Sequence, residues 1–306
     1  QAADGYTIDA FNVNYDTANN QWCTWVTNYT TWESKCDGIN QAFQDLGVDG
    51  VFNWDYVGNS YTDRLPNEIR MSDTSEDTYL KIAEWNKYVA AFFNREKEIQ
   101  DFDTNMRARW VCSAKAAEDI PAESRQKVLY LDHIWESTSG QYTPKFKIAT
   151  CTADKAQYKH CEMLKAANTI VANEDVAGLL AKGYTVDANT GEVRGIEAAD
   201  LVAWAPDVDV IIFAQTWCPV TNADDCTAAF DNILSSLAAI KAVKEKRIFD
   251  IGRIQDPFGG TAFFEGAHLE PDVLLEDVVK VTYPEVAPHH ELVWLRNMHE
   301  EGHGNA

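Results

Sequence analysis

Hydrophobic side chains recur mostly every three or four residues between Ser75 and Cys112, which is helical spacing. The apolar positions are Ile82, Trp85, Val89, Phe92, Phe93, Ile99, Phe102 and Met106. Ser75 is expected to cap the helix, and Glu76 and Asp77 suit the positive end of its dipole. An unbroken helix over 78–110 would be about 50 Å long. The pattern therefore predicts one long helix, long enough to join two lobes.

Shorter apolar runs alternate with helical patterns after Pro121. Strands are expected at 127–135, at 206–217 and at the end of 228–251, with an irregular loop at 136–147 and a strand or turn at 183–193. Helices are expected at 153–167, 173–182, 197–203, the first part of 228–251, and before Tyr283. Such alternation is typical of an α/β fold with mainly parallel sheets. After Pro288 we expect a short helix and then a frayed, Gly-rich end.

The first 77 residues have a different character. They are rich in Tyr, Trp, Thr, Asn and Asp, and the stretches 6–16 and 21–32 alternate as strands do. The prediction is an α/β protein of two lobes joined by a long backbone helix. Its parts are a shortened, β-rich N-terminal lobe (1–77), the backbone helix (78–112), a C-terminal α/β lobe (113–287) and a C-terminal tail (288–306).

Charge and hydropathy exclude two classes of partner. The chain has 306 residues and a net charge of −22, with 48 acidic against 26 basic side chains. Binding to phosphate backbones requires clustered Lys and Arg, so no nucleic acid partner is expected. No apolar run approaches the roughly 18 residues of a membrane span. The longest such run, VDVIIFA, suits a buried strand instead.

Seven cysteines favour an oxidising compartment. Three pairs are close in sequence and bracket loop-like segments, which predicts the local disulfides Cys23–Cys36, Cys151–Cys161 and Cys218–Cys226. Cys112 is left over and is expected to be a buried thiol. Asn28 begins an N-glycosylation sequon, Asn-Tyr-Thr. Together these features predict a secreted, extracellular or cell-surface protein, or a periplasmic one if the source is bacterial.

Catalytic motifs are missing from the sequence. It contains no nucleophile elbow GxSxG, no phosphate loop GxxxxGK[ST] and no GxGxxG after a strand. The segment from His299 to His303 matches HExxH, but it contains a glycine and lies near the end of the sequence, where a frayed helix cannot preorganise a site. We therefore predict no catalytic residue, no metal site and no cofactor.

Aromatic and polar residues follow several predicted strand ends, where open α/β sheets bind ligands. Aromatic rings can stack on a large flat ligand while a few polar groups orient it. The alternative is that many of these rings fill a lobe core. The candidate ligand-binding residues are Trp54, Tyr56, Arg64, His133, Trp135, Tyr142, Trp217, Phe258 and Phe263.

Several segments in their order resemble the helical-backbone periplasmic binding proteins of ABC importers. The resemblance covers roughly residues 80–287 and is carried by the long helix, the strand KVLYLDHIW, the stretches 206–217 and 228–251, and the aromatic, Gly-rich loop and helix of 252–284. It implies a non-enzymatic receptor for siderophores, haem or vitamin B12. The paired cysteines and the sequon are more typical of a secreted eukaryotic relative, for example an algal one.

Two functions remain open from the sequence. The first is an extracytoplasmic solute-binding protein that captures an iron chelate, haem or a corrinoid in an interlobe cleft, with a membrane permease or cell-surface receptor as its partner. The second is a secreted structural or cell-surface protein that reuses the fold without transport. The short N-terminal lobe and its Thr-rich, aromatic strands favour the second.

Overall fold

The computed structural model describes residues 50–54, 68–138, 141–152, 158–214, 223–254 and 261–299. The chain divides into two compact units, 1–73 and 74–306. In the first unit, β1 (Val51–Trp54) pairs in parallel with β2 (Glu68–Met71). The strands and glycosylation site expected before residue 50 lie outside the described residues.

The predicted backbone helix is two helices, so the expectation of one helix over 78–112 is wrong. After a 3-10 turn, η3 (Asp73–Ser75), α2 spans Tyr79–Ala91 and α3 spans Glu96–Glu118. Asn94 adopts a left-handed conformation with φ 53°, which Asn tolerates better than most residues. The Arg95 N–H then bonds to the Ala90 carbonyl. The cap is Thr78 rather than Ser75, because the Thr78 hydroxyl accepts from Lys81 N.

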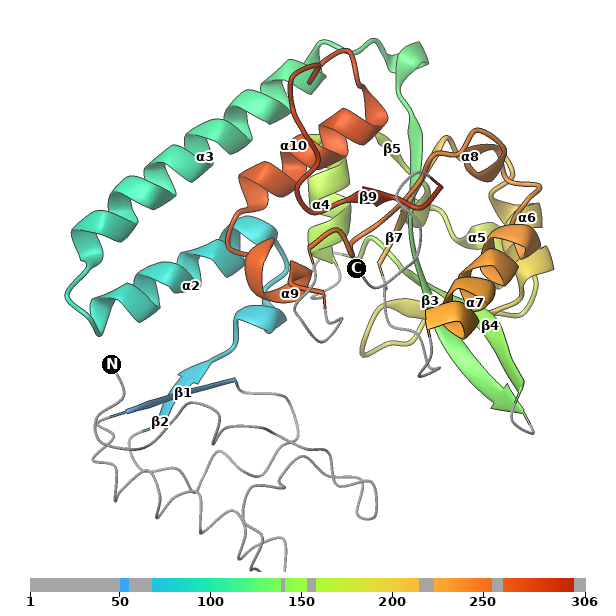
Figure 1. The fold of residues 1–306 in the computed structure, drawn as a ribbon, viewed down its shortest axis with the longest axis horizontal. Helices are drawn as coiled ribbons and strands as arrows, with labels where there is room; N and C mark the ends of the chain where they lie inside the picture. The colour runs from blue at the N-terminus through green and yellow to red at the C-terminus, as the bar shows by residue number, and fades with distance from the viewer. Residues whose placement is uncertain are drawn as a thin grey trace, which may run out of the picture. The chain divides into compact units, whose positions relative to one another are not determined.

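Ion pairs and a buried stripe join the two helices. Asp103 on α3 accepts from Lys87 of α2 at 2.7 Å, and Arg107 reaches Glu84 at 2.6 Å. The buried residues of α3 recur every three or four positions: Asp103, Met106, Trp110, Ser113 and Ala117. Both helices belong to the unit 74–306, and Figure 1 shows them joined by a tight turn.

A seven-stranded sheet forms the centre of this unit, in the order β6-β4-β3-β7-β8-β9, with β5 also paired to β3. Strands β3, β5, β7 and β8 are parallel to one another, whereas β4, β6 and β9 pair antiparallel. The sheet is therefore mixed rather than mainly parallel. The strands are β3 (Lys127–Thr138), β4 (Gln141–Ala149), β5 (Ile170–Val171), β6 (Glu192–Ile196), β7 (Val210–Phe213), β8 (Ile248–Asp250) and β9 (Arg296–Asn297).

Helices cover both faces of the sheet (Figure 1). The first layer is formed by α2, α3, α4 (Tyr158–Ala166) and α10 (Pro271–Thr282). The second layer is formed by α5 (Ala177–Leu180), α6 (Ala198–Trp204), α7 (Ala223–Ser236) and α8 (Lys241–Lys244). Short elements complete the unit: η4 (Ala122–Ser124), η5 (Ala172–Glu174) and α9 (Phe263–Gly266).

Alternation along the central strands divides the core between these two layers. On β3, Val128 and Tyr130 pack with the first layer, whereas Leu129 and Leu131 pack with the second. On β7, Ile212 and Ile211 divide in the same way. Successive side chains of a strand point to opposite faces, so a strand covered on both faces is apolar throughout. This explains why β7 is buried at every position.

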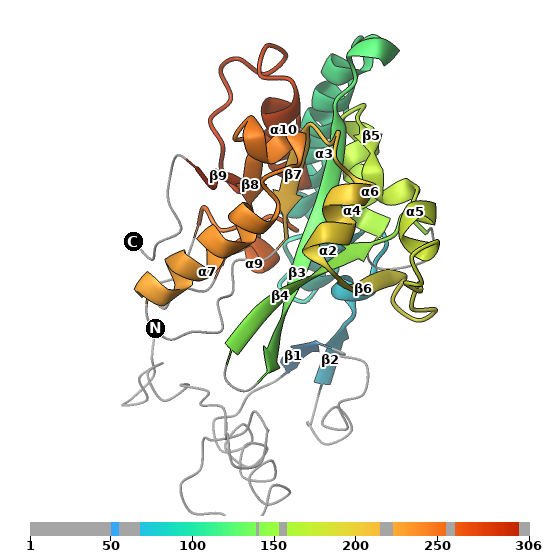
Figure 2. The same cartoon turned by 90° about the vertical axis from the view of Figure 1, so that its right-hand side faces the viewer.

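The region expected to be an irregular loop at 136–147 is instead a β-hairpin. Strand β3 continues to Thr138 and returns as β4, with Thr138 opposite Gln141. Figure 2 shows this hairpin as a long two-stranded arm. Among the helices, α6 matches its predicted range closely, and α10 ends before Tyr283 as predicted. The helix expected at 173–182 is shorter, because η5 precedes the single turn of α5.

The described residues after Pro288 form a strand and include core positions, which contradicts the expected terminal helix; the Gly-rich end lies outside the described residues. Strand β9 pairs antiparallel with β8, placing Asn297 opposite Phe249. Trp294 is 6% exposed and Leu295 1%. The N–H of Met298, whose side chain is buried as well, bonds to the Ile248 carbonyl. A truncation that deletes Met298 would thus remove core contacts.

The cysteines give one confirmed prediction and one correction. Cys151 and Cys161 form a disulfide, which ties the end of β4 to α4. Cys112 is unpaired but exposed, and it lies within α3 rather than at the end of a helix. The expectation of a buried thiol is therefore wrong. Cys23, Cys36 and Cys218 lie outside the described residues, so the pairs Cys23–Cys36 and Cys218–Cys226 stay predictions.

Candidate ligand-binding face

Two parallel strands, β7 and β8, end together at one edge of the sheet, beside the middle of β3. Leu131 of β3 is aligned with Phe213 of β7, and Phe213 is aligned with Asp250 of β8. Loops leave the sheet after β7 and β8, while β3 continues into the hairpin arm. The carboxyl ends of adjacent parallel strands are where open α/β sheets bind ligands. This edge is the candidate ligand-binding face of the unit.

The hairpin arm carries three of the predicted ligand-binding residues. In the backbone register, His133 pairs with Phe146, Trp135 with Pro144, and Tyr142 with Ser137. The sequence analysis assigned Tyr142 to a loop, but it belongs to the same two-stranded arm as His133 and Trp135. The structure thus brings these three residues into one local element that begins at the sheet edge.

The other predicted residues have different positions. Trp54 ends β1 in the small unit, and Tyr56, Arg64, Trp217 and Phe258 lie outside the described residues. Phe263 begins α9 and is only 1% exposed. Its ring contacts His268 at a centroid distance of 5.8 Å and Trp294 at 6.4 Å. The structure places Phe263 in the core, with almost no surface left for a ligand.

Charged groups fix the strand ends at this edge. Both carboxylate oxygens of Asp250 accept from Arg296 of β9, at 2.8 and 3.1 Å, and Asp250 also accepts from Gly252 N. On the arm side, Lys147 pairs with Asp132 at 2.7 Å. A bidentate arginine contact fixes geometry as well as charge. The first turn of the loop after β8 is therefore held in place.

A cluster of tyrosines and histidines is buried in the first layer. The Tyr79 hydroxyl lies 2.9 Å from His160 Nδ1, and Tyr130 stacks on His160 with centroids 3.9 Å apart. His268 contacts Tyr79 at 5.4 Å between ring centroids. Four separate segments supply the cluster: the start of α2, β3, α4 and the turn after α9.

Burial keeps both imidazoles of this cluster neutral. It lowers the pKa of His268 to about 3 and holds the pKa of His160 well below its usual range, because a low-dielectric interior disfavours the charged form. Nearby, burial raises the pKa of the Glu162 carboxyl to about 7. His268 Nε2 has no hydrogen-bond partner among the described residues.

The sequence analysis did not assign a role to Tyr79, Tyr130 or His160. A tyrosine inside the apolar run VLYLD indicates a buried hydroxyl that needs a partner. His160 lies directly before Cys161, so the disulfide prediction already placed it in an ordered element. Sequence spacing alone could not bring these residues together. Among the described residues, no group of three or more His, Cys, Asp or Glu side chains is arranged to hold a metal ion.

Comparison with solved structures relates this fold to periplasmic solute-binding proteins. A periplasmic solute-binding protein from Veillonella parvula matches with a TM-score of 0.51 at 15% identity, over 82% of this chain and 64% of that chain. The TroA-like periplasmic binding protein FepB from the same species matches with a TM-score of 0.51 at 11% identity, over 84% of this chain and 74% of that chain. This chain therefore spans less than two thirds of the first of these structures.

No protein-family model and no curated protein sequence matches the chain. At 11–15% identity, the structural likeness establishes the fold and nothing finer. The protein has an α/β fold like that of the periplasmic solute-binding proteins, as the sequence resemblance predicted. This likeness does not depend on the single long helix that the sequence analysis expected. Within the described residues, no helix combines the length and apolarity required to cross a membrane.

Proposed function

We propose that this protein is an extracytoplasmic solute-binding protein that captures an iron chelate, haem or a corrinoid and delivers it to a membrane permease or cell-surface receptor. One observation carries the proposal. Strands β7 and β8 end at Phe213 and Asp250, level with Leu131 of β3, and from this level each of the three strands leads on to a predicted aromatic residue: Trp135, Trp217 or Phe258.

A large planar ligand suits such an edge. Aromatic side chains offer extended contact area at low entropic cost and stack on conjugated rings. The fold likeness to periplasmic binding proteins supports a binding role over a catalytic one. The matched structures establish the fold and not the ligand. The ligand proposed for this chain is therefore argued from its aromatic residues.

The absorption spectrum of the protein purified from its native source is the first test, because haem, ferric chelates and corrinoids all absorb visible light. The second test is titration of the purified protein with haem, a ferric hydroxamate and cobalamin. Trp135→Ala and Trp217→Ala should each weaken binding by about 1–3 kcal/mol, the usual cost of removing a buried anchor. Trp204→Phe on α6 is the matched control and should leave affinity unchanged.

The alternative is a secreted structural or cell-surface protein that reuses the fold. The Tyr-, Trp- and Thr-rich composition of the first 77 residues supports this alternative. In that case none of the three ligands binds, and Trp135→Ala and Trp217→Ala lower thermal stability without any effect on a titration.

A further inference from the structure

A groove of about 420 Å³ lies between α3 and α10 in the unit 74–306. The loop after α10 forms its third side. None of Leu131, Phe213 and Asp250 at the carboxyl edge of the sheet is among the residues that line it. The groove is therefore a separate feature from the proposed ligand-binding face.

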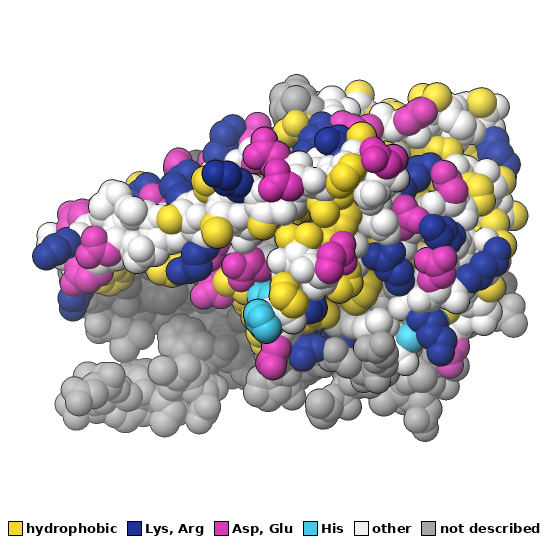
Figure 3. Space-filling view, turned by 90° about the horizontal axis from the view of Figure 1, so that it is seen from above, with side chains coloured by type: hydrophobic (Ala, Val, Ile, Leu, Met, Phe, Trp, Pro, Cys, Tyr) yellow, Lys and Arg dark blue, Asp and Glu magenta, His cyan; other side chains and the backbone are white. Residues whose placement is uncertain are grey.

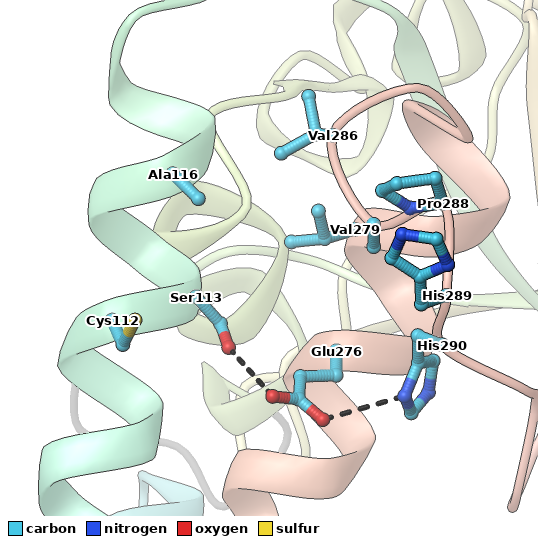
Figure 4. Close-up of a pocket in the computed structure, with 10 residues that line it drawn as sticks. Cys112, Ser113, Ala116, Glu276, Val279, Val286, Pro288, His289 and His290 are labelled. Carbon is cyan, nitrogen blue, oxygen red and sulfur yellow. Dashed lines mark hydrogen bonds and ion pairs between the residues drawn. The ribbon is translucent and has the colours of Figure 1, made fainter.

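One end of the groove is apolar. Ala116 of α3 and Val279 of α10 face each other there, and Val286 and Pro288 of the loop close that end (Figure 4). Lys280 holds the loop in place, because its ammonium group donates to the carbonyls of Ala287 and Pro288 at 3.0 and 3.1 Å. Figure 3 shows a band of hydrophobic side chains on the upper face of the molecule, with acidic and basic side chains around it.

The other end of the groove carries a carboxylate. Glu276 accepts from the Ser113 hydroxyl at 3.3 Å, and its second oxygen lies 3.3 Å from His290 Nδ1 (Figure 4). The Glu276 side chain is 35% exposed. A carboxylate has about four lone-pair sites, so these two contacts leave acceptor capacity directed to the groove.

Glu276 and Asp277 give this end of the groove more negative charge than His290 can balance, and the exposed His289 lines the groove as well. His290 Nε2 lies 2.6 Å from the fully buried Asp277, and this hydrogen bond raises the pKa of His290. With His290 protonated, Glu276, Asp277 and His290 carry a net charge of −1; with it neutral, −2. Two cations of the surrounding helices are already engaged, since Lys280 bonds to carbonyls and Arg109 pairs with Asp272.

We propose that this groove binds a small aliphatic primary amine, with its ammonium group on Glu276 and its alkyl chain against Ala116, Val279 and Val286. The ammonium group supplies three donors, and Glu276 supplies the free acceptor sites. The apolar end removes a short alkyl chain from water. An anion of the same size is repelled by Glu276. The complementarity of charge and of apolar surface thus points to one class of occupant.

The probe for this site is n-butylammonium, titrated into the full chain by NMR chemical-shift perturbation. For so few heavy atoms we expect saturable binding with Kd on the order of 1–10 mM. The neutral isostere n-butanol should bind about tenfold more weakly, because it lacks the ion pair. Butyrate should show no saturable shift.

Variants locate the site. Glu276→Gln should weaken butylammonium binding about tenfold or more. Glu285→Gln is the matched control: it removes the same charge from an exposed residue of the same loop that does not line the groove, and should change Kd less than about twofold. Ala116→Leu fills the apolar end and should abolish binding. Circular dichroism of each variant verifies that it is folded.

The pH dependence gives an independent readout. As the pH rises through the raised pKa of His290, the groove becomes more negative while the alkylammonium stays charged. Butylammonium affinity should therefore increase with pH above about 6.5. Because His289 lines the groove as well, this increase should disappear in the double variant His289→Gln, His290→Gln. Equal affinity for n-butanol and n-butylammonium, unchanged affinity in a folded Glu276→Gln variant, or no saturation at about 50 mM would each overturn the proposal.

Discussion

The first and second helical layers pack on opposite faces of the same sheet, yet they bury different chemistry. The first layer buries Asp, Lys or His side chains on three of its helices: Asp103 on α3, Lys159 and His160 on α4, and Asp272 and Asp277 on α10. In the second layer, none of the described ionisable side chains of α5–α8 is buried. Its core consists of aliphatic and aromatic residues such as Leu201, Phe213 and Phe230.

This difference shows that the two faces of one sheet can bury different kinds of core: a purely apolar core on one face and a core with buried polar pairs on the other. Apolar packing in the second layer tolerates exchange of similar side chains, because it depends on volume and pattern. Each buried polar group of the first layer requires a particular partner. We therefore expect pH sensitivity and intolerance of substitution to concentrate in the first layer.

The largest expected effect comes from Asp277. Its carboxylate is fully buried, pairs with His290 and accepts the N–H groups of Val293, Trp294 and Leu295. Asp277→Ala leaves these donors buried without a partner, which should lower the free energy of unfolding by about 3–5 kcal/mol in urea denaturation. Asp231→Ala, at an exposed position of α7, should change it by less than about 0.5 kcal/mol. Equal losses of unfolding free energy in the two variants would contradict the proposed difference between the two layers.

Acidification should destabilise the protein through the buried histidines. The pKa of His268 is lowered to about 3 and that of His160 is also lowered, so the unfolded chain binds more protons below about pH 6.5. The two histidines contribute fully to the free energy of unfolding above that pH. As the pH drops toward their pKa values in the folded protein, this contribution falls by about 1.4 kcal/mol per pH unit for each histidine. Urea denaturation of His268→Gln at several pH values should show a shallower slope. An unchanged slope would contradict burial of a neutral imidazole.

Glu162 should have the opposite effect on the pH dependence of stability: it should make the protein less stable as the pH rises. Burial raises its pKa to about 7, so the folded protein binds more protons than the unfolded chain between about pH 4.5 and 7. Its contribution to stability is therefore lost as the pH rises through this range. Because the side chain is partly solvated, the loss is about 1–2 kcal/mol. Glu162→Gln should be more stable than the unsubstituted protein at about pH 8 and equal to it near pH 4, measured by thermal unfolding.

The smallest effect is expected in the second layer. Ile211→Val removes one methylene from a fully buried position of β7, at a cost of about 0.5–1.5 kcal/mol. Because none of the described ionisable groups of α5–α8 is buried, this cost should be independent of pH between about 5 and 8. A pH-dependent difference between Ile211→Val and the unsubstituted protein would show that the two layers are coupled through the sheet.

The sequence predicted best the elements that depend on hydrophobic pattern alone. The run VDVIIFA indicated a strand within which β7 lies, and the spacing of apolar residues before Tyr283 predicted α10. The break after α2 was missed because Phe92, Phe93 and Ile99 continue the apolar stripe, while the left-handed conformation of Asn94 is a local backbone choice. The hairpin β3–β4 was missed because Pro144 and several polar residues obscure its alternation.

The ligand-binding role of the candidate face stays a prediction, and the structure changes where some of its residues lie. The rule that ligands bind at carboxyl ends of strands pointed to the segment of His133 and Trp135, but β3 continues past both residues to Thr138. The rule could not place Phe263 in the core, because that depends on packing against Trp294, which is 31 residues away in sequence. Nor could it find the cluster of Tyr79, Tyr130 and His160, whose members come from three separate elements.

The pairing of β9 with β8 bears on how the molecule avoids self-association. An exposed edge strand offers unpaired backbone groups to another chain and is a common starting point for aggregation. The β8 strand, Ile248-Phe249-Asp250, is buried and largely apolar, and a strand of only two residues covers its outer side. Protection from intermolecular strand addition is thus concentrated in Arg296 and Asn297. A proteolytic cut before them would expose the backbone groups of β8 to another chain and would also remove the buried side chain of Met298.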